Sequence, residues 1–155
     1  MNLIHLDKID STNNYAKNIL EKTSFSDFFK LDKTIIYADE QTNGRGRLNR
    51  EFFSPKNTGL YFSLIYIPKE KICDPAFITT TACVAVCKQL ENFYNNSIDC
   101  KIKWVNDIYI SDKKVCGILT ESSFDSKTNS LKYAFVGVGI NVYNPSDNFP
   151  ADIKN

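Results

Sequence analysis

The sequence predicts an α/β (α+β) domain in which a mixed β-sheet is flanked by helices. Segments with the apolar pattern of β-strands recur from residue 2 to residue 142, and two segments with helical spacing interrupt them. The chain has 155 residues, of which 43% are hydrophobic and 24% are charged. A chain of this size and composition can bury a core of its own, so we expect one domain spanning residues 1–155.

Two helices are predicted by their start signals. Residues 10–13 concentrate side chains that can cap a helix, and apolar residues follow at helical spacing as far as Leu20. Asp74-Pro75 is a capping residue followed by a proline, which predicts a second helix ending near residue 95. We expect the helix Ser11–Glu21 and this second helix to cover the face of the sheet opposite a ligand.

Strand patterns account for most of the remaining chain. Residues 59–67 are almost continuously apolar, as in a strand buried on both faces. Residues 100–105 alternate between apolar residues and lysines, as in a strand with two different faces. The other expected strands are 2–9, 33–38, a hairpin of 108–110 with 115–119, and 131–142, whereas residues 39–50 are expected to form a loop.

Composition excludes several classes of function. Nineteen basic residues face 18 acidic ones, so the net charge is +1 and the chain lacks the positive excess that drives nucleic-acid binding. No run of 18 apolar residues is present, and residues 1–10 lack the apolar region of a signal peptide. We therefore expect a cytoplasmic protein with no nucleic-acid partner and no membrane partner.

The cysteines indicate reduced thiols rather than a disulfide framework or a zinc site. Their number, five, is odd, and no CxxC pair is present. The one histidine, His5, is far from them in sequence, whereas zinc sites group thiolates and imidazoles at short spacings. The expected state of Cys73, Cys83, Cys87, Cys100 and Cys116 is buried and reduced.

All three arginines of the chain fall on one glycine-bearing segment, in which Gly46 separates Arg45 from Arg47. Glycine lets the backbone approach a ligand closely, and guanidinium groups match the oxygens of phosphate or carboxylate. The segment therefore indicates an anion site. A solvated basic turn remains possible, and a loop that enters the DNA minor groove is disfavoured by the near-neutral charge.

A second candidate follows the strand at residues 100–105. If Trp104 packs in the core, alternation directs Lys103 to solvent or into a cleft, and an exposed strand lysine remains the alternative. Asn106 and Asp107 favour a turn at the strand end. There, an amide and a carboxylate could face a ligand or a magnesium ion.

Two further segments have glycines or polar residues at positions that could contact a ligand. Gly137, Gly139 and Asn141 share one face of the last predicted strand, which indicates either a closely approaching ligand or tight packing of the sheet. A third glycine and a following helix, which a dinucleotide site needs, are missing. Ser11-Thr12-Asn13 could bind a polar ligand or simply cap the helix.

The candidate residues favour one kind of catalysis. A lone histidine supplies no catalytic triad, so covalent catalysis is not expected. The cations, amides and backbone donors of these segments instead suit stabilisation of a phosphoryl transition state.

Taken together, these segments resemble the catalytic domain of the biotin protein ligase family, the biotin–[acetyl-CoA carboxylase] ligases. The motifs are Asp-Ser-Thr-Asn from residue 10, Glu-Gln from 40, Gly-Arg-Gly-Arg from 44, Phe-Ser-Pro from 53, Gly-Leu-Tyr-Phe-Ser from 59, Lys-Trp-Val-Asn-Asp from 103, Lys-Val-Cys-Gly-Ile-Leu-Thr-Glu from 114 and Gly-Val-Gly-Ile-Asn from 137. Gly-Arg-Gly-Arg followed at this distance by Lys-Trp-x-Asn-Asp is highly specific. The resemblance implies the biotin–lipoate ligase fold, which is similar to that of class II aminoacyl-tRNA synthetases.

The resemblance also implies a reaction. ATP, with magnesium, would activate biotin as biotinyl-5′-adenylate, and biotin would then pass to a lysine of a biotin carboxyl carrier protein. The residues implied in biotin binding are Ser11, Thr12, Asn13, Gln41, Arg45, Gly46, Arg47, Lys103 and Gly117. Those implied in nucleotide binding are Arg45, Arg47, Phe52, Asn106, Asp107, Gly139 and Asn141, with Asp107 also a candidate magnesium ligand. Lys103, Arg45 and Arg47 would be catalytic.

The chain departs from the family in three places. Residues 48–52 stand where relatives often have further glycine and tryptophan, which makes Phe52 the candidate aromatic lid. Val105 stands where many relatives have proline. The sequence ends at Asn155, so we expect a catalytic domain truncated at its C-terminus, without a β-barrel domain and without an N-terminal helix-turn-helix.

Two rival functions remain open at this point. A lipoate or octanoate ligase would use the same fold and also handle an activated acyl group. A non-catalytic remnant that binds biotin would use the same head-binding residues without forming an adenylate.

Overall fold

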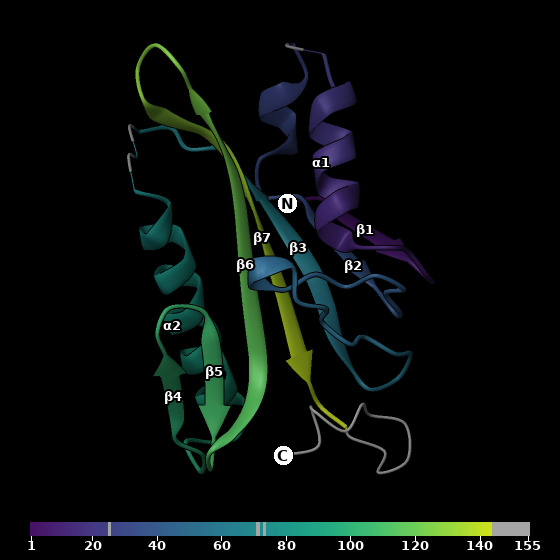
Figure 1. Cartoon of the computed structure of the whole chain (residues 1–155), viewed down its shortest axis with the longest axis vertical. Coiled ribbons are helices and arrows are strands. Elements are labelled where there is room, and N and C mark those ends of the chain that lie inside the picture. The colour runs from purple at the N-terminus through teal and green to yellow at the C-terminus, as the bar shows by residue number, and fades with distance from the viewer. Residues whose placement is uncertain (25, 71, 73, 144–155) are drawn as a thin grey trace.

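The computed structural model describes residues 1–24, 26–70, 72 and 74–143. Within them, seven strands form one sheet in the order β1-β2-β3-β7-β6-β5-β4, shown in Figure 1. Only β1 and β2 pair in parallel; the other neighbours are antiparallel. The strands are β1 (Leu3–Leu6), β2 (Ile35–Ala38), β3 (Gly59–Tyr66), β4 (Cys100–Lys103), β5 (Asp107–Ile110), β6 (Lys113–Asp125) and β7 (Ser130–Asn141). The predicted mixed sheet is confirmed.

Two α-helices begin at the predicted positions. Helix α2 (Pro75–Phe93) is capped by Asp74, whose carboxylate accepts a hydrogen bond from the Ala76 N–H at 2.8 Å. Helix α1 (Thr12–Lys22) connects the parallel strands β1 and β2. Short 3-10 helices lie at Phe28–Leu31 and Arg47–Asn49, the second of them within the segment expected to form a loop.

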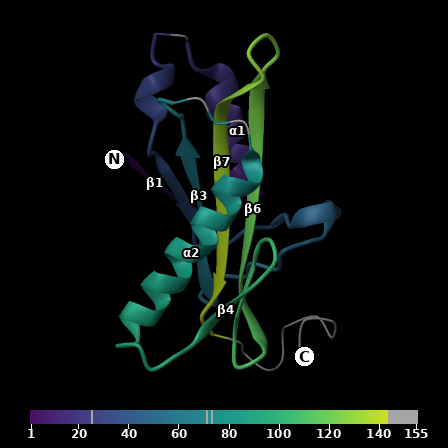
Figure 2. The same ribbon diagram turned by 90° about the vertical axis from the view of Figure 1, so that its left-hand side faces the viewer.

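The two helices lie on opposite faces of the sheet, so the prediction that both cover one face is wrong. Alternation along β7 explains the arrangement: Val136 and Val138 pack in a core with Cys83 of α2, whereas Phe135 packs with Ala16 of α1. Figure 2 shows α2 in front of the sheet and α1 behind it. The face with α1 is only partly covered by helix, which leaves room there for a ligand.

Trp104 does not enter the core. It lies in a turn that follows β4, and 78% of its surface is exposed. The alternation that suggested a buried tryptophan ends at Lys103, because β4 is the outermost strand of the sheet and the chain turns there into β5.

The four described cysteines carry free thiols, and three of them are buried. Burial raises the pKa of the Cys87 thiol to about 12 and also raises the pKa of Cys116. These thiols are therefore protonated at neutral pH and are poor nucleophiles. Cys73 lies outside the described residues. No helix in the described parts of the chain has the length and apolar content needed to span a membrane.

Candidate functional site

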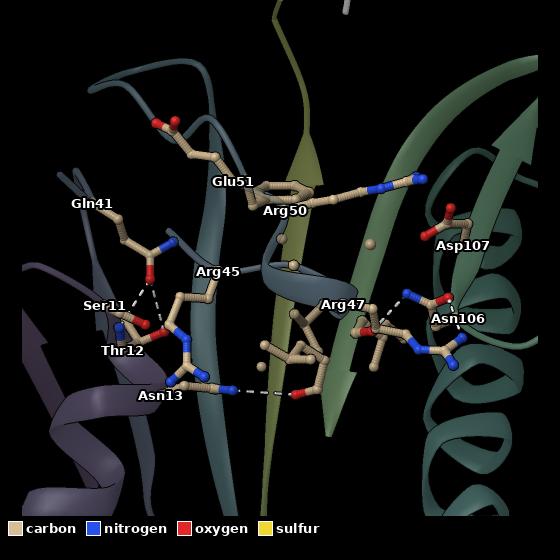
Figure 3. Close-up of a pocket in the computed structure, with 18 of the residues that line it drawn as sticks. Ser11, Thr12, Asn13, Gln41, Arg45, Arg47, Arg50, Glu51, Asn106 and Asp107 are labelled. Atoms are coloured by element: carbon tan, nitrogen blue, oxygen red, sulfur yellow. Dashed lines mark hydrogen bonds between the residues drawn. The ribbon is translucent and has the colours of Figure 1, made fainter. Parts of the chain in front are cut away.

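A cavity of about 250 Å³ opens on the face of the sheet that carries α1. The start of α1, the segment 41–52, the start of β5, the first half of β6 and the later part of β7 surround it, as Figure 3 shows. The residues lining it are Ser11, Thr12, Asn13, Gln41, Arg45, Gly46, Arg47, Leu48, Arg50, Glu51, Phe52, Phe62, Asn106, Asp107, Lys114, Gly117, Ile118, Leu119, Gly137, Val138 and Gly139. Four segments far apart in the sequence, each singled out by its motif, thus meet at one site.

The arginine segment is held over the sheet by its own backbone. Gln41 and Ser54 form an antiparallel bridge, and Arg45 and Glu51 form a second one, so residues 41–54 fold back on themselves. Toward the tip of the segment, the Gly46 N–H donates to the Arg50 carbonyl at 2.7 Å. The segment predicted as a loop is therefore a narrow hairpin-like arm that carries the arginines.

One end of the cavity is neutral and rich in hydrogen-bonding groups. The Gln41 Oε1 atom accepts from the Thr12 N–H at 2.9 Å and from the Thr12 hydroxyl at 3.1 Å, and its amide nitrogen donates to Ser54 at 3.0 Å. Ser11 occupies the N-cap position of α1, but its side chain makes no capping hydrogen bond. The residue is buried and lines the cavity, so its ligand-binding role stays a prediction that this position permits.

A carboxylate connects this neutral end with the arginine arm. Glu121 accepts from Asn13 Nδ2 at 2.9 Å through one oxygen and pairs with Arg45 Nη2 at 3.0 Å through the other. The second terminal nitrogen of Arg45 donates to Asn14 at 2.9 Å. Arg45 is therefore oriented by two partners, neither of which was among the predicted site residues.

The other end of the cavity is charged. Arg47 donates to the Asn106 side-chain oxygen at 3.3 Å, and Asp107 pairs with Lys114 at 2.8 Å between Oδ1 and Nζ. Figure 3 shows Arg50 extending across the cavity toward Asp107. Arg47, Arg50 and Lys114 thus lie near the one carboxylate at this end, that of Asp107. This end of the cavity therefore favours anions.

Glycines form the floor between the two ends. Gly117 and Gly139 are register partners on β6 and β7, and the Phe52 ring lies directly over both, where Cβ atoms would otherwise project. Phe52 also packs edge-on against Tyr61, with ring centroids 6.4 Å apart. The space over these glycines is thus filled by a side chain of the protein itself, which is the close packing that the sequence left open. Ligand contacts of Gly117 and Gly139 stay a prediction.

Gly137→Ala is expected to destabilise the fold by about 1–3 kcal/mol because of overpacking. An added Cβ would lie 3.0 Å from the Asn13 Cγ atom. Asn13 cannot move aside without losing hydrogen bonds to Ser63 and Glu121. Urea unfolding of the variant and the parent measures the difference.

Gly117→Ala is the matched control for this prediction. Its Cβ would meet the edge of the Phe52 ring at 3.1 Å, and a ring at the cavity surface can shift. A loss for Gly137→Ala no larger than that for Gly117→Ala would contradict the view that Asn13 is held rigidly.

Two predicted site residues do not line the cavity. Lys103 shares a row with Asp107, Gly117 and Gly139 across the sheet and so points to the same face. Its ammonium, however, lies over the ring of Tyr109, 5.5 Å from the centroid. Asn141 is the last residue of β7 and pairs with Gly59, two residues beyond Gly139 of the cavity floor.

The proposed metal role of Asp107 stays a prediction. Asp107 Oδ1 is buried, makes no well-aligned hydrogen bond, and is already 2.8 Å from the Lys114 ammonium. No three-ligand group forms around it among the described residues. These residues do not fit a preformed magnesium site.

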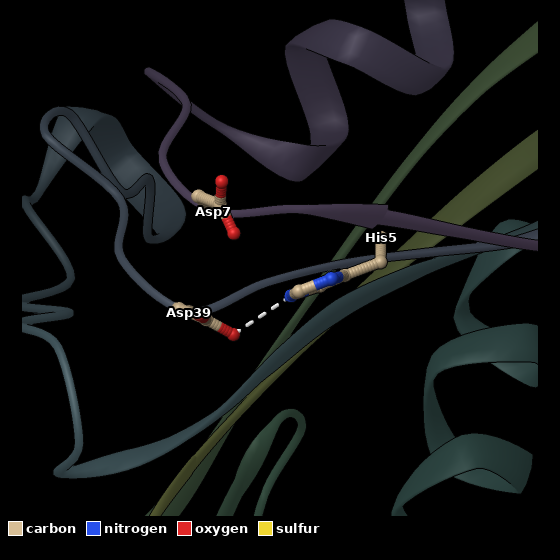
Figure 4. A group of neighbouring side chains, drawn as sticks. All are labelled: His5, Asp7 and Asp39. Atoms are coloured by element: carbon tan, nitrogen blue, oxygen red, sulfur yellow. Dashed lines mark hydrogen bonds and ion pairs between the residues drawn. The ribbon is translucent and has the colours of Figure 1, made fainter.

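One group of three possible metal ligands exists elsewhere in the described parts of the chain. His5, Asp7 and Asp39 lie on and after β1 and β2, outside the cavity, as shown in Figure 4. His5 Nε2 is 2.9 Å from Asp39 Oδ1, and the Lys56 ammonium approaches the other Asp39 oxygen at 3.9 Å. The group is open to solvent and partly neutralised by a lysine, and we assign it no metal.

Comparison with known sequences agrees with the geometry. Residues 6–141 match the family described as biotin/lipoate A/B protein ligase. The bifunctional ligase/repressor BirA of Bacillus spizizenii is 36% identical over 152 residues, which cover 98% of this chain and 44% of BirA. The chloroplastic biotin–protein ligase 1 of Arabidopsis thaliana is 32% identical over 115 residues, which cover 72% of this chain and 30% of that protein.

Comparison with solved structures leads to the same group of proteins. The biotin protein ligase from Aquifex aeolicus in complex with biotin and ATP has a TM-score of 0.69 and 35% identity, covering 99% of this chain and 56% of that one. A biotin protein ligase-like protein of unknown function from a Silicibacter species, 11% identical, shares the fold with a TM-score of 0.71. The chain spans about half the length of the relatives that it matches, 44% of BirA and 56% of the Aquifex protein.

Proposed function

The chain belongs to the biotin/lipoate A/B protein ligase family, and on this premise we propose that it activates biotin with ATP. The reaction joins the biotin carboxylate to the α-phosphate of ATP and releases pyrophosphate. The biotinyl group of the adenylate then passes to a lysine amine of a biotin carboxyl carrier protein, and AMP leaves.

The observation that carries this proposal is the asymmetry of the cavity. Its α1 end presents neutral donors and acceptors from Ser11, Thr12 and Gln41, whereas its β5–β6 end presents Arg47 and Lys114. A ligand pair with an uncharged polar head and adjoining phosphates matches this distribution. The relative from Aquifex aeolicus binds biotin and ATP together, which supports the same pairing of ligands.

The neutral end of the cavity favours biotin because its polar groups can form hydrogen bonds with the head of biotin. A ureido ring has one carbonyl acceptor and two N–H donors, and the free hydroxyl of Ser11 can serve either kind of group. Ligands that lack those groups would leave buried polar atoms unpaired, which is costly. Selectivity for biotin over an acyl chain without such a head follows from this cost.

The arginine arm would supply the electrostatic part of the first step. A carboxylate that attacks the α-phosphate brings two anions together, and fixed cations offset their repulsion best when no reorganisation is needed. Arg45 is pre-oriented by Glu121 and Asn14, and Arg47 by Asn106. The bond to the pyrophosphate oxygen then breaks as the bond to the carboxylate oxygen forms.

The second step needs no nucleophile from the chain itself. The acceptor amine attacks the acyl carbonyl of the adenylate and displaces AMP, whose phosphate is a good leaving group. This agrees with the cysteines, since the Cys87 and Cys116 thiols are held in the protonated form by burial. The nature of the carrier rests on family membership.

The experiment is a mass-spectrometric assay for the adenylate. The 155-residue chain is incubated with ATP, magnesium and either biotin or lipoate, and the products are measured with and without an isolated biotin carboxyl carrier domain. We expect biotinyl-adenylate without the carrier and biotinylated carrier with it. Lipoyl-adenylate in place of biotinyl-adenylate would assign the chain to the lipoate branch, and biotin binding without either adenylate would make it a binding protein.

A further inference from the structure

Lys114 is the one lysine among the residues that line the cavity in the described parts of the chain. Its Cε atom lies 3.5 Å from the position that a Cβ of Gly117 would take, so the side chain runs along the glycine floor. Lys103, in contrast, contacts Tyr109 at the edge of the sheet. Lys114, and not Lys103, therefore places its side chain along the cavity.

A β-bulge in β6 directs Lys114 into the cavity. Ile108 of β5 pairs with Cys116, but the next residue, Tyr109, pairs with Lys114, so Val115 is an extra residue on β6. Val115 and Cys116 both pack in the core beneath α2. The bulge therefore moves Lys114 to the opposite face, where Gly117 lies; in a regular strand it would share the α2 face with Cys116.

The ammonium of Lys114 has one partner and spare donors. Its Nζ atom pairs with Asp107 Oδ1 at 2.8 Å, and 41% of the side chain is exposed, compared with 22% for Asp107. A lysine ammonium carries three donors, so two remain for a ligand in the cavity. Asp107 holds the ammonium at the charged end, beside Asn106 and the arginine arm.

We propose that Lys114 binds a phosphate of the nucleotide, as a specificity and binding residue that the bulge in β6 places in the cavity. This rests on the proposed function, which supplies the nucleotide. An ammonium that is flexibly attached and already partly desolvated acts on phosphate oxygens as a point charge. Lys114 accordingly contributes to the affinity for ATP and not to the affinity for the neutral head of biotin.

The test is calorimetric binding of ATP to the full chain and its variants. Lys114→Ala is expected to raise the Kd for ATP about tenfold or more, since a charge-assisted hydrogen bond is lost. The Kd for biotin alone should stay within about twofold of the parent. Lys114→Arg, which keeps the charge, should recover much of the ATP affinity.

Lys113→Ala is the matched control, because Lys113 is the exposed neighbour on β6 and does not line the cavity. If Lys114→Ala does not fold, Lys114→Gln replaces it, because glutamine can still donate to Asp107. An unchanged Kd for ATP in Lys114→Ala or Lys114→Gln would overturn the inference while leaving the proposed function intact.

The two proposals can fail separately. If the parent binds ATP but forms no biotinyl-adenylate, the proposed function fails, and the effect of Lys114→Ala on ATP affinity still decides the role of Lys114. A parent that binds no ATP would overturn both.

Discussion

Lys103→Ala is expected to slow single-turnover formation of biotinyl-adenylate by roughly 10²–10³-fold, as removal of a donor that stabilises developing charge commonly does. Lys103 lies opposite Asp107 in the β4–β5 pair and faces the side of the sheet that holds the cavity. Its ammonium contacts the Tyr109 ring at 5.5 Å. A cation–π contact at an exposed site stabilises by only about 0.5–1 kcal/mol, so an anionic ligand pair in the cavity can draw the ammonium away from the ring.

Lys101→Ala is the control, because Lys101 is exposed and points to the same face of β4 two residues earlier. An exposed strand lysine with no catalytic role would change stability by less than about 0.5 kcal/mol when replaced. Adenylate formation at the parent rate in both variants would show that the role proposed for Lys103 is wrong. The effect also differs from that of Lys114→Ala, which should act on ATP affinity.

Gln41→Ala is expected to weaken biotin binding by about 10–100-fold, the loss associated with hydrogen bonds that leave buried partners unpaired. Gln41 binds both the N–H and the hydroxyl of Thr12 and donates to Ser54. Without it, the start of α1 and the base of the arginine arm lose their shared partner at the neutral end of the cavity. The affinity for ATP, which is set at the other end, should fall much less.

Calorimetric titration of both ligands checks this expectation. Thr42→Ala is the control, since Thr42 is exposed, adjacent in sequence and absent from the cavity lining. Equal weakening of biotin and ATP by Gln41→Ala would count against the assignment of Gln41 to the biotin head, because it would indicate a general collapse of the cavity.

Features of the fold that depend on near neighbours in sequence were predictable. The cap at Asp74 follows from local hydrogen bonding. Helix α1 begins where residues 10–13 predict it, although the Ser11 side chain makes no capping hydrogen bond. The strand periods located β3 and β7 to within one or two residues. Strand β6 extends to Asp125, beyond its predicted end at 119, because polar residues on its later part hid the apolar pattern.

The residues of the candidate site, too, were only partly predictable from the sequence. Ser11, Gln41, Arg45 and Asn106 were found because each belongs to a motif that stands out locally, and the structure brings them to one cavity. Glu121 was missed as a site residue because its partner Arg45 lies 76 positions away in sequence. No local pattern records such a pairing.

The sequence by itself therefore determined which segments carry chemistry, because residue type, capping and strand period act over a few residues. The tertiary structure decided which face each segment presents. The opposite placement of α1 and α2 depends on how β7 divides its side chains between two cores. The face of the sheet on which the Lys114 side chain lies depends on one extra residue of β6, Val115, opposite β5. A shift of one residue in strand pairing exchanges the two faces of a sheet, and only the pairing partner, which is distant in sequence, sets that register.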